Sequence, residues 1–527
     1  MPSCPPSEPV LADTRALLVS GGDARIRRDP ATGLSKYGCG AQPDPDLIAL
    51  GSCTASTIST AGMAAANALR TACLQALKDQ PATTVYATRA QRLRTTLIDL
   101  CGFTESDRVD AVLAASGTDV LLLAAQWLKP DCTVMVEPGE TGSGAVAALR
   151  GQHFNPRTAH RASVTIGDPI GDWRGTLVTL PVREADGSLR QAAEIDAEWM
   201  ARVNAAAQAG QRVLLILTDV TKTGLIVPGI DTVLALKRRW PAQVEVLVDA
   251  CQFRMSMATV RAYVAEGWMV ALTGSKFVAG PTFSGVLLVP PATAHRYRDV
   301  ALGSGAGAYS GIADWPRGWA AGASLPATTN FGLLLRWEAA LPNLRAFAAL
   351  SDQAVAAFLR RFGETITTAL AANPCFEALP VAALARGSLA GRKNRDADWG
   401  AEWAAEWDTT QTIFPFLLRA PGSLRPLQRD ETEKVHRALQ LAGDLHGGRR
   451  FQLGQPVACG LRDAVEVSAL RLCVSAPMMV AACTGGEAAV EAALGAALAA
   501  FDRIGELLAA RHAAGRRPDA THNLHIG

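Results

Sequence analysis

The feature that most limits the fold of this chain is a series of short apolar runs separated by helical stretches. Runs rich in Val, Ile and Leu occupy residues 132–138, 176–182, 212–220 and 244–250. Continuous apolar runs, rather than alternating apolar and polar residues, are typical of strands buried on both faces. Helical stretches between consecutive runs favour parallel pairing, because a parallel connection needs a crossover. The sequence therefore predicts an α/β fold with a mainly parallel sheet covered by helices.

The character of the sequence changes along the chain, which predicts three parts. Residues 1–75 form an N-terminal arm, residues 76–330 a large α/β domain, and residues 331–527 a connector helix with a smaller α+β domain. A polar stretch with tryptophans at helical spacing, 391–411, is predicted as an insertion, and the last residues of the chain as a tail. Loops that follow the strands of the large domain are where we expect the chemistry.

Composition excludes several classes of protein. With 49% apolar and 19% charged residues, the chain can bury a sizeable core. A net charge of +2 without a long basic run gives no reason to expect nucleic acid as a partner. No run is long and apolar enough for a membrane span, and the first residues do not resemble a signal peptide. We therefore expect a cytoplasmic protein with no membrane partner.

Cysteine and histidine usage argues against a metal centre. The chain has 11 cysteines and 8 histidines, and no two cysteines have the spacing of a CxxC pair. We therefore expect neither a disulfide framework nor a metal site.

Lys276 stands in the run "LTGSKFVAG", at the end of a predicted strand. Lysine is rarely buried, so one reading is a surface residue at a strand end. The other reading is chemical: a lysine shielded from water has a lowered pKa, and its neutral amine can form a Schiff base with a carbonyl. The commonest cofactor for such a lysine is pyridoxal 5′-phosphate, an electron sink.

Pyridoxal phosphate needs an acid beside its ring nitrogen and a polar neighbour for its phenolic oxygen. Asp249 ends the apolar run "VEVLVDA", where a buried carboxylate is costly unless it is paired. A protonated ring nitrogen would be that pair, although Asp249 could also cap a helix. Gln252 lies three residues further on and can reach the phenolic oxygen.

The phosphate group needs backbone N–H and hydroxyl donors. The turn "SGTD" offers the N–H groups of Gly117 and Thr118 at a predicted helix N-terminus, which favours a phosphate. Thr273 and Ser275, on either side of Gly274 and before the lysine, add hydroxyl groups.

Taken together, these motifs resemble the fold-type I PLP-dependent enzymes, and most closely the class V aminotransferase and cysteine desulfurase branch. That branch carries Asp-x-x-Gln on a strand and a Schiff-base lysine roughly 25 positions later; here "DACQ" begins at Asp249 and Lys276 follows by 27 residues. The resemblance covers about residues 45–500. It implies the PLP-dependent transferase fold type I, with a seven-stranded-type sheet, pyridoxal phosphate as cofactor, and a homodimer.

The resemblance also implies further site residues. Thr221, in "DVTKTG", stands where many relatives have a cofactor-contacting Asn. Thr328, in "LPATTNFG", resembles a residue whose hydroxyl reaches the phosphate in the neighbouring subunit. Arg471, in "ALRLCVS", resembles the arginine that binds the substrate carboxylate.

Two positions depart from the family pattern. The branch usually stacks a His on the cofactor, but "VMVEPGETGSG" has none, so Glu140 and Thr141 would have to cover that face. Desulfurases carry a nucleophilic cysteine shortly before the late arginine. Cys459 lies near that place, but the surrounding motif does not match.

The predicted protein is thus a PLP-dependent enzyme that acts on an amino acid or a related amine. Lys276 and Asp249 would be catalytic, and Arg471 would bind the substrate. An aminotransferase is favoured. The alternatives are a lyase or cysteine-desulfurase-type enzyme that breaks a C–S bond or performs β-elimination, and a non-catalytic PLP-fold binding protein. The substrate and the role of residues 33–60 stay open.

Overall fold

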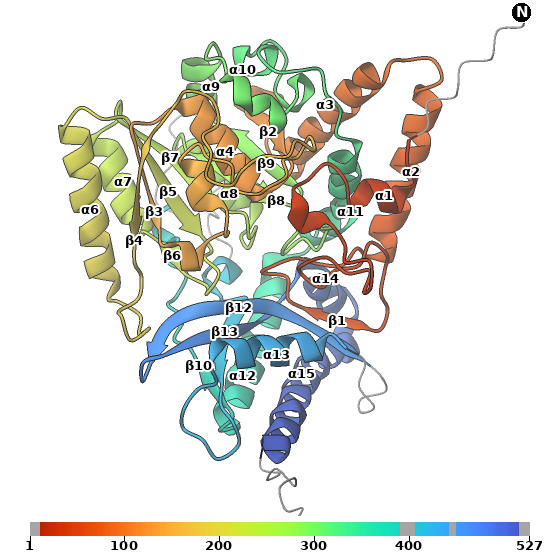
Figure 1. Ribbon diagram of the computed structural model, residues 1–527, viewed down its shortest axis with the longest axis vertical. Coiled ribbons are helices and arrows are strands. Elements are labelled where there is room, and N and C mark those ends of the chain that lie inside the picture. Colours follow the sequence, from red (N-terminus) through yellow and green to blue (C-terminus); the bar gives the residue numbers. More distant parts are fainter. Residues whose placement is uncertain (1–10, 390–405, 442–448, 516–527) are drawn as a thin grey trace, which may run out of the picture.

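The computed structural model of the protein describes residues 11–389, 406–441 and 449–515. Most of the predicted insertion 391–411 and the C-terminal tail lie outside these residues, although Trp407 is described and its indole nitrogen donates to Asp352, 3.0 Å away. The described chain is built around two sheets, a large one enclosed by helices and a smaller one beside it (Figure 1).

The large sheet has eight strands and is mainly parallel. Its strands are β2 (Asp110–Ala114), β3 (Cys132–Val136), β4 (Thr176–Leu180), β5 (Val213–Asp219), β6 (Ile226–Val227), β7 (Val244–Asp249), β8 (Met269–Thr273) and β9 (Gly285–Val289). Seven follow the order β2-β9-β8-β7-β5-β3-β4, and β6 pairs with β5. Within the seven, β9 runs antiparallel to both neighbours and the remaining pairings are parallel. The predicted sheet class is confirmed.

Both faces of the large sheet are buried, as the continuous apolar runs predict. On β5, Leu214 and Ile216 point into one core, whereas Leu215 and Leu217 point into the other. This split follows from the alternation of side chains along a strand. The first core is covered by α4 (Gly117–Leu128), α5 (Ala145–Leu149), α9 (Pro291–Tyr297) and α10 (Ala320–Ala323); the second by α3 (Ala82–Leu100), α6 (Ala192–Gln208), α7 (Ile230–Arg239) and α8 (Met257–Ala265).

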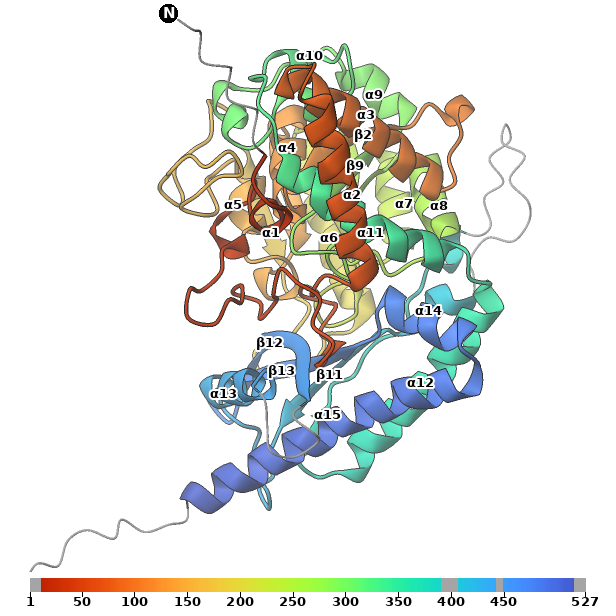
Figure 2. The same ribbon diagram turned by 90° about the vertical axis from the view of Figure 1, so that its right-hand side faces the viewer.

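The smaller sheet belongs to the predicted α+β part. Its order is β1 (Leu47–Leu50), β12 (Arg450–Arg462), β13 (Val465–Cys473), β11 (Ile413–Leu418) and β10 (Phe376–Ala378). Its helices are α12 (Asp352–Ala372), α13 (Arg429–Leu439), α14 (Ala476–Thr484) and α15 (Gly486–Gly515), reached from the large sheet through α11 (Phe331–Ala348) (Figure 2). Strand β1 comes from the N-terminal region and pairs parallel with β12, a contact that the sequence did not indicate. The three-part division of the chain stays a prediction.

The N-terminal arm is tied to the large domain by Arg336 of α11. Its guanidinium is fully buried and donates to the carbonyls of Phe283, Leu18, Ser20 and Gly21. The arm segment around α1 (Thr14–Leu18) is therefore held by one cation that satisfies several backbone acceptors at once. None of the described helices is long and apolar enough to cross a bilayer.

Replacing Arg336 with methionine should loosen this arm. The substitution leaves buried carbonyls without a donor, and we expect a loss of about 2–3 kcal/mol in the free energy of unfolding. Urea unfolding measures the loss, and limited proteolysis locates it in the arm. Arg345→Met, exposed on the same helix, should change stability by less than about 0.5 kcal/mol. Equal stability of the two variants would contradict the role given to Arg336.

Candidate active site

A cavity of about 640 Å³ lies at the C-terminal ends of β5, β7 and β8. Its wall is completed by the N-terminal region, by α13 and by β12 and β13. Ligands of open α/β sheets bind at this end of the strands. Most of the predicted site residues line the cavity: Gly117, Thr118, Asp249, Gln252, Thr273, Ser275, Lys276 and Arg471.

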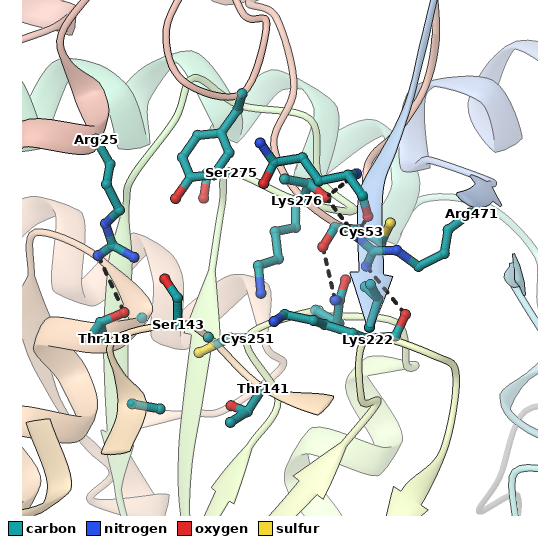
Figure 3. Close-up of a pocket in the computed structure, with 18 of the residues that line it drawn as sticks. Arg25, Cys53, Thr118, Thr141, Ser143, Lys222, Cys251, Ser275, Lys276 and Arg471 are labelled. Carbon is teal, nitrogen blue, oxygen red and sulfur yellow. Dashed lines mark hydrogen bonds between the residues drawn. The ribbon is translucent and has the colours of Figure 1, made fainter. Parts of the chain in front are cut away.

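Lys276 follows β8 and extends into the middle of the cavity (Figure 3). The loop can take this course because Gly274 packs against α11: a Cβ there would lie 2.8 Å from Trp337 and 2.9 Å from Ala340. In the part of the chain that the structure describes, the Lys276 ammonium has neither a hydrogen bond nor an ion pair. The side chain is half-buried, and an amine held in a cavity without a partner is available to a ligand.

Asp249 is the last residue of β7 and is 7% exposed. One carboxylate oxygen accepts from the backbone N–H of Cys251 at 3.2 Å, and the other from the hydroxyl of Thr141 at 3.4 Å. No cation pairs with it among the described residues. Neutral donors thus position the carboxylate, and its negative charge could be balanced by a cationic group of a ligand in the cavity.

The N-terminus of α4 forms one end of the cavity. Ser116 caps it by accepting from the N–H of Asp119 at 3.3 Å. Only glycine fits at position 117, since a Cβ would lie 2.6 Å from the sulfur of Cys251. Gly117 and Thr118 line this end of the cavity, and the N-terminus of a helix favours an anion. The Thr273 hydroxyl is not free there, because it donates to the carbonyl of Cys251 at 2.6 Å.

Arg25 adds a cation to this end, and the sequence did not single it out. It lies in η1 (Ala24–Ile26) of the N-terminal arm, where Nη2 is 2.6 Å from Asp23 and donates to the hydroxyl of Thr118 at 3.4 Å (Figure 3). Its guanidinium also packs on the ring of Phe283, 4.8 Å from the centroid. Burial lowers the pKa of Arg25, but the hydrogen bond to Asp23 and the charges of neighbouring acidic groups together outweigh burial and raise it. The arginine is charged at any working pH.

Arg471 lies at the opposite end, on β13. Its guanidinium donates to the hydroxyl of Thr54 at 3.0 Å and to the carbonyls of Gln455 at 2.5 Å and Lys222 at 3.3 Å. Its Nε is buried without a partner, and no carboxylate pairs with Arg471 in the described ranges. The Glu466 carboxylate on the same strand lies 3.7 Å from Arg429 instead. A buried cation fixed by neutral acceptors suits an anionic ligand.

Cys53 brings the unassigned N-terminal block 33–60 into the site. Burial raises the pKa of its thiol, but a hydrogen bond from Cys473 and the charges of Arg471 and Arg254 outweigh burial and lower it. Lys36 and Tyr37 of the same block also line the cavity. The sequence marked residues 33–60 as a block of unassigned role, but no motif indicated which of its residues reach the site.

The other predicted residues lie in different surroundings. Gln252 lines the cavity, but its amide donates to the carbonyl of Cys53 at 3.0 Å. Thr221 and Thr328 are not among the lining residues: the Thr221 hydroxyl accepts from the N–H of Leu225 at 3.1 Å, and the Thr328 hydroxyl lies 3.4 Å from His160.

Three residues were named above where the sequence departs from the family pattern, and two of them line the cavity. Glu140 and Thr141 are part of its wall. Cys459 lies outside the lining set and is buried on β12, where burial raises the pKa of its thiol.

No protein-family model matches this chain, and no curated protein is similar to it. Solved structures with a similar course of the chain include TDC of Oryza sativa with PLP, at 14% identity over 96% of this chain and 90% of that chain, with a TM-score of 0.49. The cysteine desulfurase CsdA of Escherichia coli matches at 14% identity over 87% of this chain and 94% of that chain, with a TM-score of 0.49. A NifS-like protein of Rickettsia africae matches at 9% identity over 86% of this chain and 99% of that chain, with a TM-score of 0.48. Identities this low leave the role of each side chain to the geometry of this site.

Proposed function

We propose that the protein is a PLP-dependent enzyme that acts on an amino acid, with Lys276 as the residue that holds the cofactor. The observation that supports this most directly is the unpaired Lys276 amine in a cavity that also contains the unpaired carboxylate of Asp249. The Asp249 carboxylate is costly to bury alone, and a ligand with a positive charge for Asp249 and a carbonyl for the half-buried Lys276 would use both groups.

The residues present fit pyridoxal phosphate. The start of α4 and the guanidinium of Arg25 suit its phosphate, Asp249 suits its ring nitrogen, and Lys276 suits its aldehyde. The Ser275 hydroxyl lines the same wall. When bound, the cofactor supplies an electron sink for a bond broken at the substrate Cα.

The protein's own groups then have separate tasks. Asp249 keeps the ring nitrogen protonated through its negative charge. Arg471 orients the substrate by binding its carboxylate with a planar guanidinium. The Lys276 amine takes the Cα proton and returns a proton as general base and acid.

An aminotransferase is the reaction we favour, and the second candidate is an enzyme that breaks a C–S bond. The observation that favours the second is Cys53, which lines the cavity and whose thiol pKa is lowered, despite burial, by the hydrogen bond from Cys473 and the charges of Arg471 and Arg254. Product analysis separates the two: an aminotransferase yields a keto acid and an aminated acceptor, whereas a lyase or desulfurase yields ammonia or sulfide. Loss of sulfide release in Cys53→Ser, with the reduced adduct on Lys276 still formed, would favour the second.

We expect a homodimer in the cytoplasm. Thr328 lines no part of the cavity of its own chain, and the family resemblance implies that such a residue serves the neighbouring subunit. Sedimentation of the purified protein tests the oligomeric state.

Reductive trapping tests the proposed function. We expect the protein supplied with pyridoxal phosphate to absorb visible light, and borohydride followed by peptide mapping to locate a reduced adduct on Lys276. Lys222, which lines the same cavity, serves as the internal comparison and should stay unmodified. A colourless protein, or an adduct spread over several lysines, would refute the proposal.

A further inference from the structure

The end of the cavity near Arg471 contains more positive charge than one substrate carboxylate requires. Lys222, Lys276 and Arg471 all line it. Figure 3 shows that the side chains of Lys222 and Lys276 extend into the same part of the cavity. Lys276 is committed to the cofactor in the proposed function and Arg471 to the α-carboxylate, so Lys222 remains.

Lys222 is held in place by its backbone. It lies in the loop after β5, where its N–H donates to the carbonyl of Glu140 at 2.9 Å and its own carbonyl accepts from Arg471 at 3.3 Å. Its ammonium has no hydrogen bond and no ion pair within residues 11–389, 406–441 and 449–515. The backbone is thus fixed while the charged end is free to bind a ligand.

Glu140, whose backbone carbonyl bonds to the N–H of Lys222, does not serve as the partner of the ammonium. The Glu140 carboxylate accepts from Arg183 at 3.2 Å, from the Thr223 hydroxyl at 2.7 Å and from the Thr223 N–H at 3.1 Å. Arg183 balances its charge. Lys222 therefore remains an uncompensated cation beside the reacting centre.

The guanidinium of Arg254 does not add to the unpaired positive charge that lines the cavity. It is fully buried behind the cavity and donates to Ser52 at 2.8 Å and to the carbonyl of Val474 at 2.8 Å. It also donates to Gln252 and Thr412. Its donors are used within the protein, and it does not line the cavity.

We propose that the substrate is an amino acid with a second anionic group, such as a dicarboxylic amino acid, and that the Lys222 ammonium binds this second anion. The inference rests on the proposed function, because Lys276 and Arg471 have their roles from it. An anion at Lys222 would balance the surplus charge in a part of the cavity shielded from water, where such a pair is stronger than at the surface.

The electrostatic surroundings of Lys222 agree with this role. Burial and then the charges of Arg471 and Lys276 lower its pKa to about 8, against the opposing pull of Glu140 and Cys53. The ammonium is still mainly protonated at neutral pH. Its charge is lost as the pH rises through about 8, so the affinity for a second anion should fall about tenfold per pH unit above that value.

Matched ligands and variants test the inference. Calorimetry compares L-glutamate with L-glutamine, and L-aspartate with L-asparagine, on protein loaded with pyridoxal phosphate. We expect the wild type to bind the better acid about 10- to 150-fold more tightly than its amide, the range of a hydrogen bond to a charged group. Lys222→Met should abolish that preference with little change in amide affinity, and Lys222→Arg should keep part of it. Lys78→Met, exposed and remote on the chain, should bind like the wild type.

Two further experiments distinguish a failure of this inference from a failure of the proposed function. Borohydride mapping of Lys222→Met should still place the adduct on Lys276, which shows an intact site. The same calorimetry without added cofactor tests Lys222 independently of Lys276 chemistry. If the adduct never forms, the proposed function fails, while a Lys222-dependent preference for the acid would still support the second-anion site. Equal affinity for acid and amide in the wild type, or a preference that survives in Lys222→Met, would overturn the inference.

Discussion

Lys276→Ala is expected to slow exchange of the substrate Cα proton by about 10²–10⁴-fold, the usual contribution of a positioned acid or base. The side chain extends to the middle of the cavity without another partner among the described residues, so its removal deletes the group that takes the proton and leaves the wall intact. Proton NMR in D₂O, with saturating pyridoxal phosphate and amino acid, measures this exchange whichever reaction follows.

Two comparisons make this result specific. Lys78→Met, outside the cavity, should exchange at the wild-type rate. Added methylamine should restore part of the rate in Lys276→Ala, because a small amine can enter the space left by the side chain. Exchange within about threefold of the wild type in Lys276→Ala, a far smaller change than that of a lost general base, would contradict the assignment.

Arg386→Met is expected to cost about 3–5 kcal/mol in the free energy of unfolding, the range for breaking a buried ion pair by removing one partner. Arg386 and Asp219 are almost fully buried and are bonded through both carboxylate oxygens, with Nε to Oδ2 at 2.9 Å. Tyr263 donates to the same carboxylate at 2.6 Å. Without the guanidinium, the buried Asp219 carboxylate has no other cation paired with it among the described residues.

Urea unfolding measures this loss against a surface pair. Arg361→Met removes an arginine that is 41% exposed and pairs with Glu487, and we expect a much smaller loss, because water screens an exposed pair. The double variant with Asp219→Asn should recover part of the stability, because the uncompensated charge is gone. Equal losses for Arg386→Met and Arg361→Met would show that burial does not strengthen the inner pair.

The strands of the large sheet could be predicted because their side chains are apolar on both faces. On β7, for example, Val246 and Leu247 point into opposite cores, and either core alone would demand an apolar residue. The start of α4 was equally readable, since Ser116 and Gly117 form a local cap whose geometry depends on adjacent residues. Such features need no information from distant parts of the chain.

Parts of the site that come from distant segments could not be read in this way. Strand β1 pairs with β12. The two strands are about 400 residues apart in sequence, so the sequence of one does not predict its pairing with the other. Cys53, which follows β1, and Arg25, from the arm segment held by Arg336, both line the cavity. The hydroxyls of Thr221 and Thr273 were both expected at the cofactor, and in the structure both bond to nearby backbone. Their contact with the cofactor stays a prediction.

The sequence by itself determined the sheet class, the lysine at the end of β8 and the carboxylate at the end of β7, because strand burial and loop position are local properties of the chain. Only the tertiary structure decided which charges are left over. Whether Lys222, Arg471 or Asp249 has a counterion depends on side chains from several segments meeting in three dimensions, and buried charge is stabilised by its neighbours in space rather than by its neighbours in sequence.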